Sequence, residues 1–449
     1  MPDDAVLDRL TNETVELLQQ LIRNQCVNDG TPESGNEEVS AKLLLHELEG
    51  TGLDLQTFEP TPNRTSLIAR YEGTDPSAPS LCLMGHTDVV PVSPDGWDRD
   101  PFGGELVGDE IWGRGAVDML NLTSSMAVAF RHIVKSGQRF PGDIIYFGVA
   151  DEEAGGVHGA KVLIDTEWDA LKCDYVLTEF GGIPLHSSAG TTLLVTTAEK
   201  GIGWTKITVN GTPGHGSMPY GTDNALVKAA EVVRRISEYS PQPRLDELWG
   251  ARIKAMGLPD DLARRLVDPA ALKDALAELP PGVAGLTHAC SHTTFSPNVV
   301  HGGVKTNVIP DKVVVEVDIR TLPGETYDDV LAHLREALGD AMEWVEIESI
   351  AQDPSTSSPI DNPLWRALTG SMHLSYPEAA IIPSIVTGGT DSRFFREKGT
   401  VAFGAGLLSN KIDAGEFMRR FHGHNERIDV ESLRLTTKLW LDVVDRLWA

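Results

Sequence analysis

Apolar residues recur at helical spacing near both ends of the chain. Residues 4–24 and 36–48 each carry an apolar stripe, and residues 120–135 and 430–448 repeat the pattern. Apolar positions three and four residues apart share one face of a helix. We therefore predict four amphipathic helices that each bury one face in a core.

Short apolar runs between these helices predict β-strands. Residues 143–149 are strongly apolar, which is typical of a strand at the buried centre of a sheet. Further strands are predicted at 53–58, 66–71, 80–84, 175–177, 382–386 and 401–403. The alternation of strands and helices indicates an α/β sandwich.

The pattern changes near residue 195 and predicts a second, inserted domain. Strand or helix patterns in this region cover residues 200–209, 224–239, 312–320 and 327–338. We predict a first domain of residues 1–197 and 324–449 and an inserted domain of residues 198–323. The last helix and a strand near residue 345 could also belong to the insert, which would then end as late as residue 352.

Composition narrows the functional classes. The formal net charge of −28 would repel phosphate backbones and anionic membranes, so we expect neither a nucleic-acid nor a membrane partner. No stretch approaches a membrane span, and the acidic start lacks the apolar core of a signal peptide. The four cysteines are scattered and form no CxxC pair. We expect a cytoplasmic protein with reduced cysteines.

Acidic and histidine motifs stand where the predicted strands end. His86 follows the strand at 80–84, the run Asp151-Glu152-Glu153 follows 143–149, and Glu179 follows 175–177. Ligands collect at the carboxyl ends of strands in open α/β sheets. With Asp118 and His422, these residues could hold two divalent ions that share one carboxylate and leave one glutamate free as a general base. This set predicts a dinuclear metallohydrolase.

Each of these residues also has a simpler explanation. His86 could be a hydrogen-bonded edge residue, although Asp88 could accept its second ring N–H, as partners of metal-bound histidines do. Asp118 could cap the next helix. The acidic run could be a solvated loop. Because adjacent residues of an extended chain point apart, Glu153 could bind metal while Glu152 faces the substrate.

Several motifs in their order along the chain resemble the dinuclear zinc amidohydrolases and peptidases, which include aminoacylase, bacterial glutamate carboxypeptidase, acetylornithine deacetylase, succinyl-diaminopimelate desuccinylase and carnosine dipeptidases. The motifs are MGHTDVVP (84–91), GRGAVD (113–118), DEE (151–153), GHGS (214–217), TNVIP (306–310), DIR (318–320), GGTD (388–391) and HGHNE (422–426). The resemblance implies a catalytic α/β sandwich with a central mixed sheet. It also implies an inserted α+β, ferredoxin-like lid that forms a homodimer.

The resemblance assigns roles to the site residues. It implies two Zn²⁺ ions per subunit, with Co²⁺ or Mn²⁺ as alternatives: His86, Asp118 and Glu179 would hold one ion, and Asp118, Glu153 and His422 the other. It favours His422 over His424 and implies a cis peptide after Asp118. Glu152 would be the general base, and Asp88 would orient His86.

The resemblance also implies roles for residues outside the metal cluster. His215 would stabilise the oxyanion, often from the partner subunit, although its sequence context alone is typical of a surface turn. Asn307, Arg320, Thr390 and Arg393 are candidates for binding a substrate carboxylate, because the planar guanidinium of arginine suits that group. Both arginines could instead be ordinary surface cations. Residues 241–283 lengthen the insert relative to compact relatives.

The leading hypothesis is hydrolysis of an amide or peptide bond in a small substrate that carries a carboxylate, such as a dipeptide, a C-terminal residue or an N-acyl amino acid. A catalytically silent relative that binds a ligand or acts as a scaffold is the alternative, but no expected ligand or base is missing. Phosphoester hydrolysis would require additional cations at the metals, and the sequence places none there.

Overall fold

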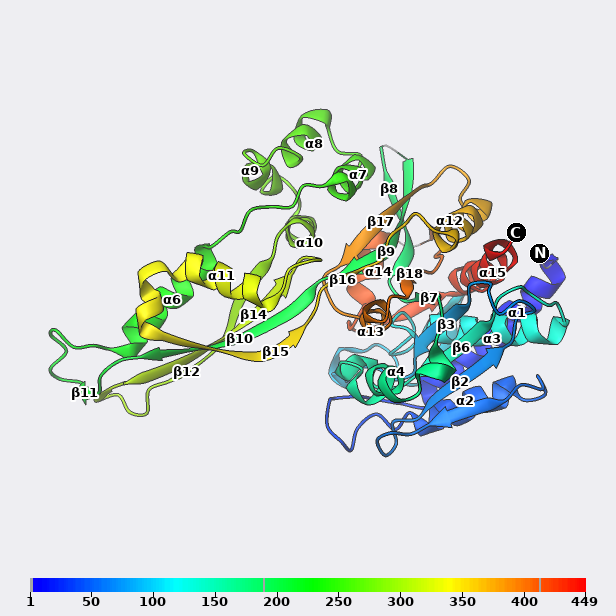
Figure 1. The fold of residues 1–449 in the computed structure, drawn as a ribbon, viewed down its shortest axis with the longest axis horizontal. Helices are drawn as coiled ribbons and strands as arrows, with labels where there is room; N and C mark the ends of the chain where they lie inside the picture. Colours follow the sequence, from blue (N-terminus) through cyan, green and yellow to red (C-terminus); the bar gives the residue numbers. More distant parts are fainter. Residues whose placement is uncertain (1–2, 189, 412) are drawn as a thin grey trace.

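The computed structural model describes residues 3–188, 190–411 and 413–449, and its two largest sheets belong to different parts of the molecule (Figure 1). The larger sheet has the strand order β1-β2-β6-β3-β7-β18-β9-β16, and β8 and β17 also pair with β9. Its strands are β1 (Leu55–Phe58), β2 (Ser66–Tyr71), β3 (Leu81–His86), β6 (Ile144–Val149), β7 (Tyr175–Thr178), β8 (Gly181–Ser187), β9 (Gly190–Glu199), β16 (Thr356–Ser357), β17 (Ala380–Val386) and β18 (Val401–Gly404). Parallel and antiparallel pairs both occur, so the sheet is mixed.

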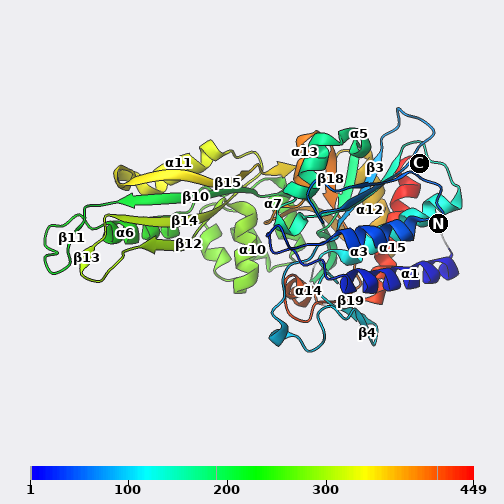
Figure 2. The ribbon, with the colours of Figure 1, turned by 90° about the horizontal axis from the view of Figure 1, so that it is seen from below.

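Helices cover both faces of this sheet, which confirms the predicted α/β sandwich. The helices of the larger unit are α1 (Asp4–Arg23), α2 (Glu38–Leu48), α3 (Leu120–Ser136), α4 (Val162–Thr166), α5 (Trp168–Leu171), α12 (Pro363–Ser375), α13 (Ser392–Glu397), α14 (Ala414–Arg420) and α15 (Val430–Leu447). Figure 2 shows α1, α3 and α15 together on one side.

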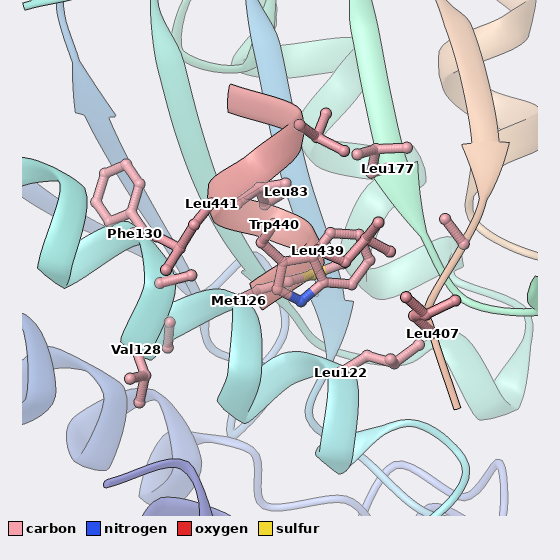
Figure 3. Close-up of a cluster of buried hydrophobic side chains, with 14 of the residues drawn as sticks. Leu83, Leu122, Met126, Val128, Phe130, Leu177, Leu407, Leu439, Trp440 and Leu441 are labelled. Carbon is pink, nitrogen blue, oxygen red and sulfur yellow. The ribbon is translucent and has the colours of Figure 1, made fainter. Parts of the chain in front are cut away.

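The strand β3 shows why both faces are apolar. Leu81 and Leu83 belong to the core beneath α3 and α15, whereas Cys82 and Met84 belong to the core on the opposite face. Alternate side chains of a strand point to opposite faces, so a wholly apolar strand is buried on both sides. Trp440 of α15 packs in the first core, and its indole N–H donates to Ser125 of α3 (Figure 3).

The second sheet has four antiparallel strands in the order β12-β14-β10-β15. Its strands are β10 (Gly201–Asn210), β12 (Thr294–Gly302), β14 (Lys312–Thr321) and β15 (Val345–Asp353), and its tip carries the pair β11 (Gly214–His215) and β13 (Val308–Ile309). Helices α6 (Ala225–Glu238) and α11 (Tyr327–Leu338) share a core with this sheet. Because β15 pairs with β10, we propose the later boundary, near residue 353, for the insert.

Residues 241–283, whose structure the sequence left open, lie within a small helical cluster. Helices α7 (Glu247–Ala255), α8 (Asp260–Leu266), α9 (Leu272–Leu276) and α10 (Pro281–Ser291) enclose a core of their own around Trp249 and Leu266. α7 also packs against β17 of the larger sheet. A three-stranded sheet, β4 (Glu105–Val107), β5 (Glu110–Trp112) and β19 (Arg427–Asp429), completes the strands. Within the described residues, no helix is both long and apolar enough to cross a membrane.

Candidate dinuclear metal centre

Three neighbouring strands of the large sheet bring predicted site residues to one edge. β3 ends at His86, β6 leads into the run at 151–153, and β7 leads directly into Glu179. β3 pairs in parallel with both β6 and β7, so the three carboxyl ends coincide. At Gly85 a Cβ atom would lie 2.9 Å from the Cα of Thr123, so only glycine lets β3 approach α3 this closely.

Asp118 lies between the two histidines. Its Oδ1 is 3.3 Å from Nε2 of His86, and its Oδ2 is 3.2 Å from Nε2 of His422. Glu179 Oε2 lies 3.7 Å from the first histidine, and Glu153 Oε2 lies 3.4 Å from the second. The cluster therefore has two histidine–carboxylate halves joined by one carboxylate. The ring of His424 lies against Gly96 instead.

The charges of this cluster are unbalanced. Burial raises the pKa of both Glu153 and Glu179. Glu153 Oε1 and Glu179 Oε2 are shielded from solvent and accept no hydrogen bond from any residue that the structure describes. The hydrogen bonds to Asp118 and Glu153 raise the pKa of His422 to about 10. Carboxylates gathered in this way are favourable only beside compensating cations, and the mixture of imidazole and carboxylate ligands suits divalent transition metals.

Glu152 lies beside the cluster on a short 3₁₀ turn, Glu152–Ala154, that begins after Asp151 at φ 73°. The run at 151–153 was expected to be extended, but it forms a turn, and this turn separates the directions of Glu152 and Glu153. The Oε2 atom of Glu152 is 3.9 Å from Nε2 of His86, and burial raises the pKa of Glu152 well above its usual range. His86, Glu152 and Glu179 are also close enough to hold a single ion.

Asp88 links the two halves of the cluster from behind. The Nδ1 atom of His86 lies 3.0 Å from the backbone carbonyl of Asp88 and 3.5 Å from its carboxylate, so the carbonyl is the nearer acceptor. This differs from the expectation that the Asp88 carboxylate accepts the second ring N–H. Asp88 Oδ2 instead accepts hydrogen bonds from the backbone N–H of Glu153 and from the amide of Asn28.

The peptide bond between Asp118 and Met119 is cis, as the resemblance implied. The loop that carries Asp118 is fixed by a residue from the other end of the chain. Glu426 Oε1 accepts the backbone N–H groups of Val117 and Asp118, and its Oε2 pairs with Arg114 at 2.7 Å.

A buried polar network, which the sequence did not indicate, lies behind the candidate metal ligands. Asn28 also donates to Asp151, and the Arg64 guanidinium donates to Asn28 and to Glu37 at 2.8 Å. Arg64 and Glu37 are almost fully buried. No local pattern marks them, because isolated polar residues in loops reveal their partners only after folding. Asp391 was visible in the GGTD motif; among the described residues, both of its buried carboxylate oxygens lack a hydrogen-bond donor.

Two predicted residues are far from this cluster within the chain. His215 is in β11, at the far tip of the second sheet (Figure 1). Asn307 is there too, because its carbonyl accepts the backbone N–H of Gly216. The His215 ring contacts Ser217 Oγ at 2.8 Å.

The other carboxylate-binding candidates lie away from this tip: Thr390 and Arg393 follow β17, and Arg320 pairs with Ile202 near the last residues of β14. Arg393 donates to the carbonyls of Thr390 and of Gly155, which directly follows the Glu152–Ala154 turn, so part of its hydrogen-bonding capacity is already used. Arg320 pairs with Asp318 at 2.8 Å and stacks over Trp204.

Comparisons with known proteins agree with this geometry. The sequence model of peptidase family M20/M25/M40 matches residues 82–446 of this chain. The chain is similar to N-fatty-acyl-amino acid synthase/hydrolase PM20D1 of Xenopus tropicalis, with 28% identity over 84% of this chain and 74% of that one. It is similar to aminoacylase-1 of Sus scrofa, with 27% identity over 92% and 90%. Its fold is similar to that of the M20 family metallo-carboxypeptidase Sso-CP2 from Sulfolobus solfataricus, with a TM-score of 0.72 and 19% identity over 97% and 99%.

Proposed function

Because this chain belongs to peptidase family M20/M25/M40, we propose that it hydrolyses the amide bond of a small substrate that carries a free carboxylate, such as an N-acyl amino acid or a dipeptide. Membership of the family makes it a metal-dependent hydrolase of amide or peptide bonds. The number and identity of the metals, the roles of individual residues and the assembly are the parts that we propose.

The residues present fit two divalent ions, for which we propose zinc. His86, Glu179 and Asp118 would hold one ion, and Asp118, Glu153 and His422 the other. Two bound ions supply a water acidified enough to attack near neutral pH, and they stabilise the negative charge that develops on the carbonyl oxygen. The observation that carries this proposal is Asp118, whose two oxygens face different histidines at 3.3 and 3.2 Å.

Glu152 acts as the general base in this proposal. It takes a proton from the attacking water and returns it to the leaving nitrogen. Burial and the charge of Glu179 raise the pKa of Glu152. A carboxylate with a raised pKa binds a proton more readily, which suits a group that must take up a proton and then release it. A ligand role is also possible by distance, but Glu179, Asp118, Glu153 and two histidines already provide a complete set without it.

The position of His215 supports a homodimer. It is far from the metal cluster of its own chain (Figure 1). We propose that the second sheet joins two subunits and that each supplies His215 and Asn307 to the site of its partner. Arg320 and Thr390 would bind the substrate carboxylate within the same chain. We propose a cytoplasmic location because all four cysteines are free thiols, as is usual in a reducing compartment.

The test is a hydrolysis screen of the purified protein with added Zn²⁺, Co²⁺ or Mn²⁺. The panel comprises dipeptides and N-acetyl, N-succinyl and longer N-acyl amino acids, each with a matched amide that lacks the free carboxylate. Hydrolysis of carboxylate substrates only is the expected result. Activity on phosphoesters alone, or metal binding without any turnover, would contradict the proposal and favour the silent relative.

A further inference from the structure

A narrow apolar pocket lies next to the metal ligand Glu179. Its walls are hydrocarbon: Leu122, Phe180, Ile183, Leu408, Phe417 and Phe421. The rings of Phe180 and Phe421 stack with centroids 5.3 Å apart, and Phe417 meets Phe421 edge to face. The free volume is about 20 Å³, which is enough for a small group, since one water needs roughly 10–15 Å³.

A polar side chain without a partner faces the same pocket. Asn121, near the start of α3, lines it and is 3% exposed. Its Oδ1 atom is shielded from solvent and makes no hydrogen bond to any described residue. An unpaired buried amide destabilises a fold, and most buried polar groups are satisfied. The unpaired amide oxygen of Asn121, close to Glu179, therefore indicates that a bound substrate donates the missing hydrogen bond.

The position of the pocket indicates which half of the substrate would enter it. Glu152 returns its proton to the leaving nitrogen, so the amine half lies beside the turn that carries Glu152. The pocket is bounded by Glu179 and Phe180, and neither Glu152 nor its turn lines it. The half of the substrate that carries the scissile carbonyl is thus the half that faces these apolar walls.

We propose that this pocket binds a short aliphatic group attached to the scissile carbonyl and that Asn121 hydrogen-bonds the same half of the substrate. The inference rests on the proposed amide hydrolysis and names its substrate class. Aromatic and aliphatic walls favour hydrocarbon through the hydrophobic effect. The narrow volume favours a chain of a few carbons over a fatty acyl chain. The group could belong to an N-acyl amino acid or to the first residue of a dipeptide.

The first test enlarges the pocket. Phe417→Ala should shift the preferred substrate toward longer chains in a series of N-acetyl to N-octanoyl derivatives of one amino acid. We expect at least about a tenfold rise in the octanoyl-to-butanoyl ratio of kcat/KM, since one methylene is worth roughly 10–200-fold in such pockets. Met418→Ala, an exposed change on the same helix, should leave the ratio unchanged. Equal effects of Phe417→Ala on all lengths would overturn the proposal.

Dipeptides with the same second residue distinguish the two sources of the group. If the first residue supplies it, Phe417→Ala should shift the preference from alanine toward leucine at that position, while the N-acyl series stays unhydrolysed. If the acyl chain supplies it, Phe417→Ala should shift the preference toward longer acyl chains, while the dipeptides stay unhydrolysed. A change in neither series counts against the pocket.

The second test separates a binding role of Asn121 from a structural one. Asn121→Leu removes the unpaired amide with little change in volume, so the thermal midpoint should rise while kcat/KM for acyl substrates falls about tenfold or more. A lower midpoint, or a higher midpoint with unchanged kcat/KM on every substrate, would show that Asn121 serves the fold or a trapped water only.

Binding measurements keep this inference separate from the proposed function. Calorimetry of zinc-loaded Glu152→Gln protein with acetate, butanoate and octanoate requires no turnover. Chain-length-dependent affinity that Phe417→Ala shifts would support the pocket even if no amide were hydrolysed. Amide hydrolysis together with length-independent carboxylate binding would refute the pocket and leave the proposed function intact.

Discussion

Arg114 and Glu426 form a buried ion pair although 312 residues separate them in the sequence; Nη1 of the arginine lies 2.7 Å from Oε2 of the glutamate. The same arginine donates to the backbone carbonyl of His422 at 3.3 Å. The other glutamate oxygen accepts the backbone N–H of Asp118. The pair therefore fixes the loop of Asp118 relative to the loop of His422.

Removal of one member of this pair should lower both the stability of the fold and the affinity for metal. Arg114→Met would leave Glu426 buried and unpaired, so the free energy of unfolding of the metal-free protein should fall by about 3–5 kcal/mol in urea titrations. Metal affinity should fall by roughly 10–100-fold because the loops lose their support. The control is Arg434→Met, which removes ion pairs with exposed Asp4 and Asp8 and should cost under about 1 kcal/mol. Equal losses in both variants would contradict this account.

A second prediction concerns Glu152, the proposed general base. Glu152→Gln keeps the size of the side chain but cannot take a proton, so kcat should fall by about 10²–10⁴-fold or more. Metal content, measured by elemental analysis after dialysis, should stay at two ions per chain. Glu33→Gln is the matched control at an exposed position. Loss of one metal from the Glu152 variant would identify it as a ligand.

That His86, Glu153 and Glu179 meet at one edge of the sheet could be predicted from the sequence, because this edge is made from local features. An apolar strand followed by a histidine or a carboxylate, as at His86 and Glu179, is visible in a few residues, and three parallel strands must end together. The partners behind the edge are not visible in this way. Asn28, Arg64 and Glu37 meet only through tertiary contacts. Likewise, sequence order could not reveal that His215 is far from the cluster of its own chain.

Metal addition should stabilise the fold. Glu153 and Glu179 each keep a solvent-shielded oxygen that has no hydrogen-bond partner in the described part of the chain, so cations bound there would relieve repulsion in the folded state only. A free metal concentration 100-fold above Kd should raise the free energy of unfolding by about 2.7 kcal/mol per site. The thermal midpoint should rise with Zn²⁺ in two steps. Glu153→Ala should abolish one step, whereas a midpoint insensitive to metal would argue against the site.

Mixing of two inactive variants tests the exchange of His215 between subunits. Glu152→Gln and His215→Ala proteins should each be nearly inactive. After unfolding and refolding together in equal amounts, half of the dimers are mixed, and each mixed dimer has one complete site. About a quarter of wild-type activity should therefore return. If His215 acts within its own chain, mixed dimers contain no complete site, and activity stays at the level of the separate variants.

Lys200, which joins β9 to β10, gives a pH-dependent prediction away from the metals. Lys200 is 2% exposed, and its ammonium donates to the carbonyls of Ala289 and His292 and to the hydroxyl of Thr294. Burial, only partly opposed by the charges of Cys290 and Glu325, lowers its pKa from 10.5 to about 8.

Because the folded-state pKa of Lys200 is the lower one, the unfolded chain binds more protons between pH 8 and 10.5. The burial penalty is fully present below pH 8 and disappears as the pH rises through this window. The stability of wild type relative to Lys200→Met should thus rise by about 3 kcal/mol between these limits, measured by urea unfolding of metal-free protein. Lys273→Met, at an exposed position, should show no such slope. A constant difference between wild type and Lys200→Met across the window would mean that Lys200 keeps an ordinary pKa in the folded protein.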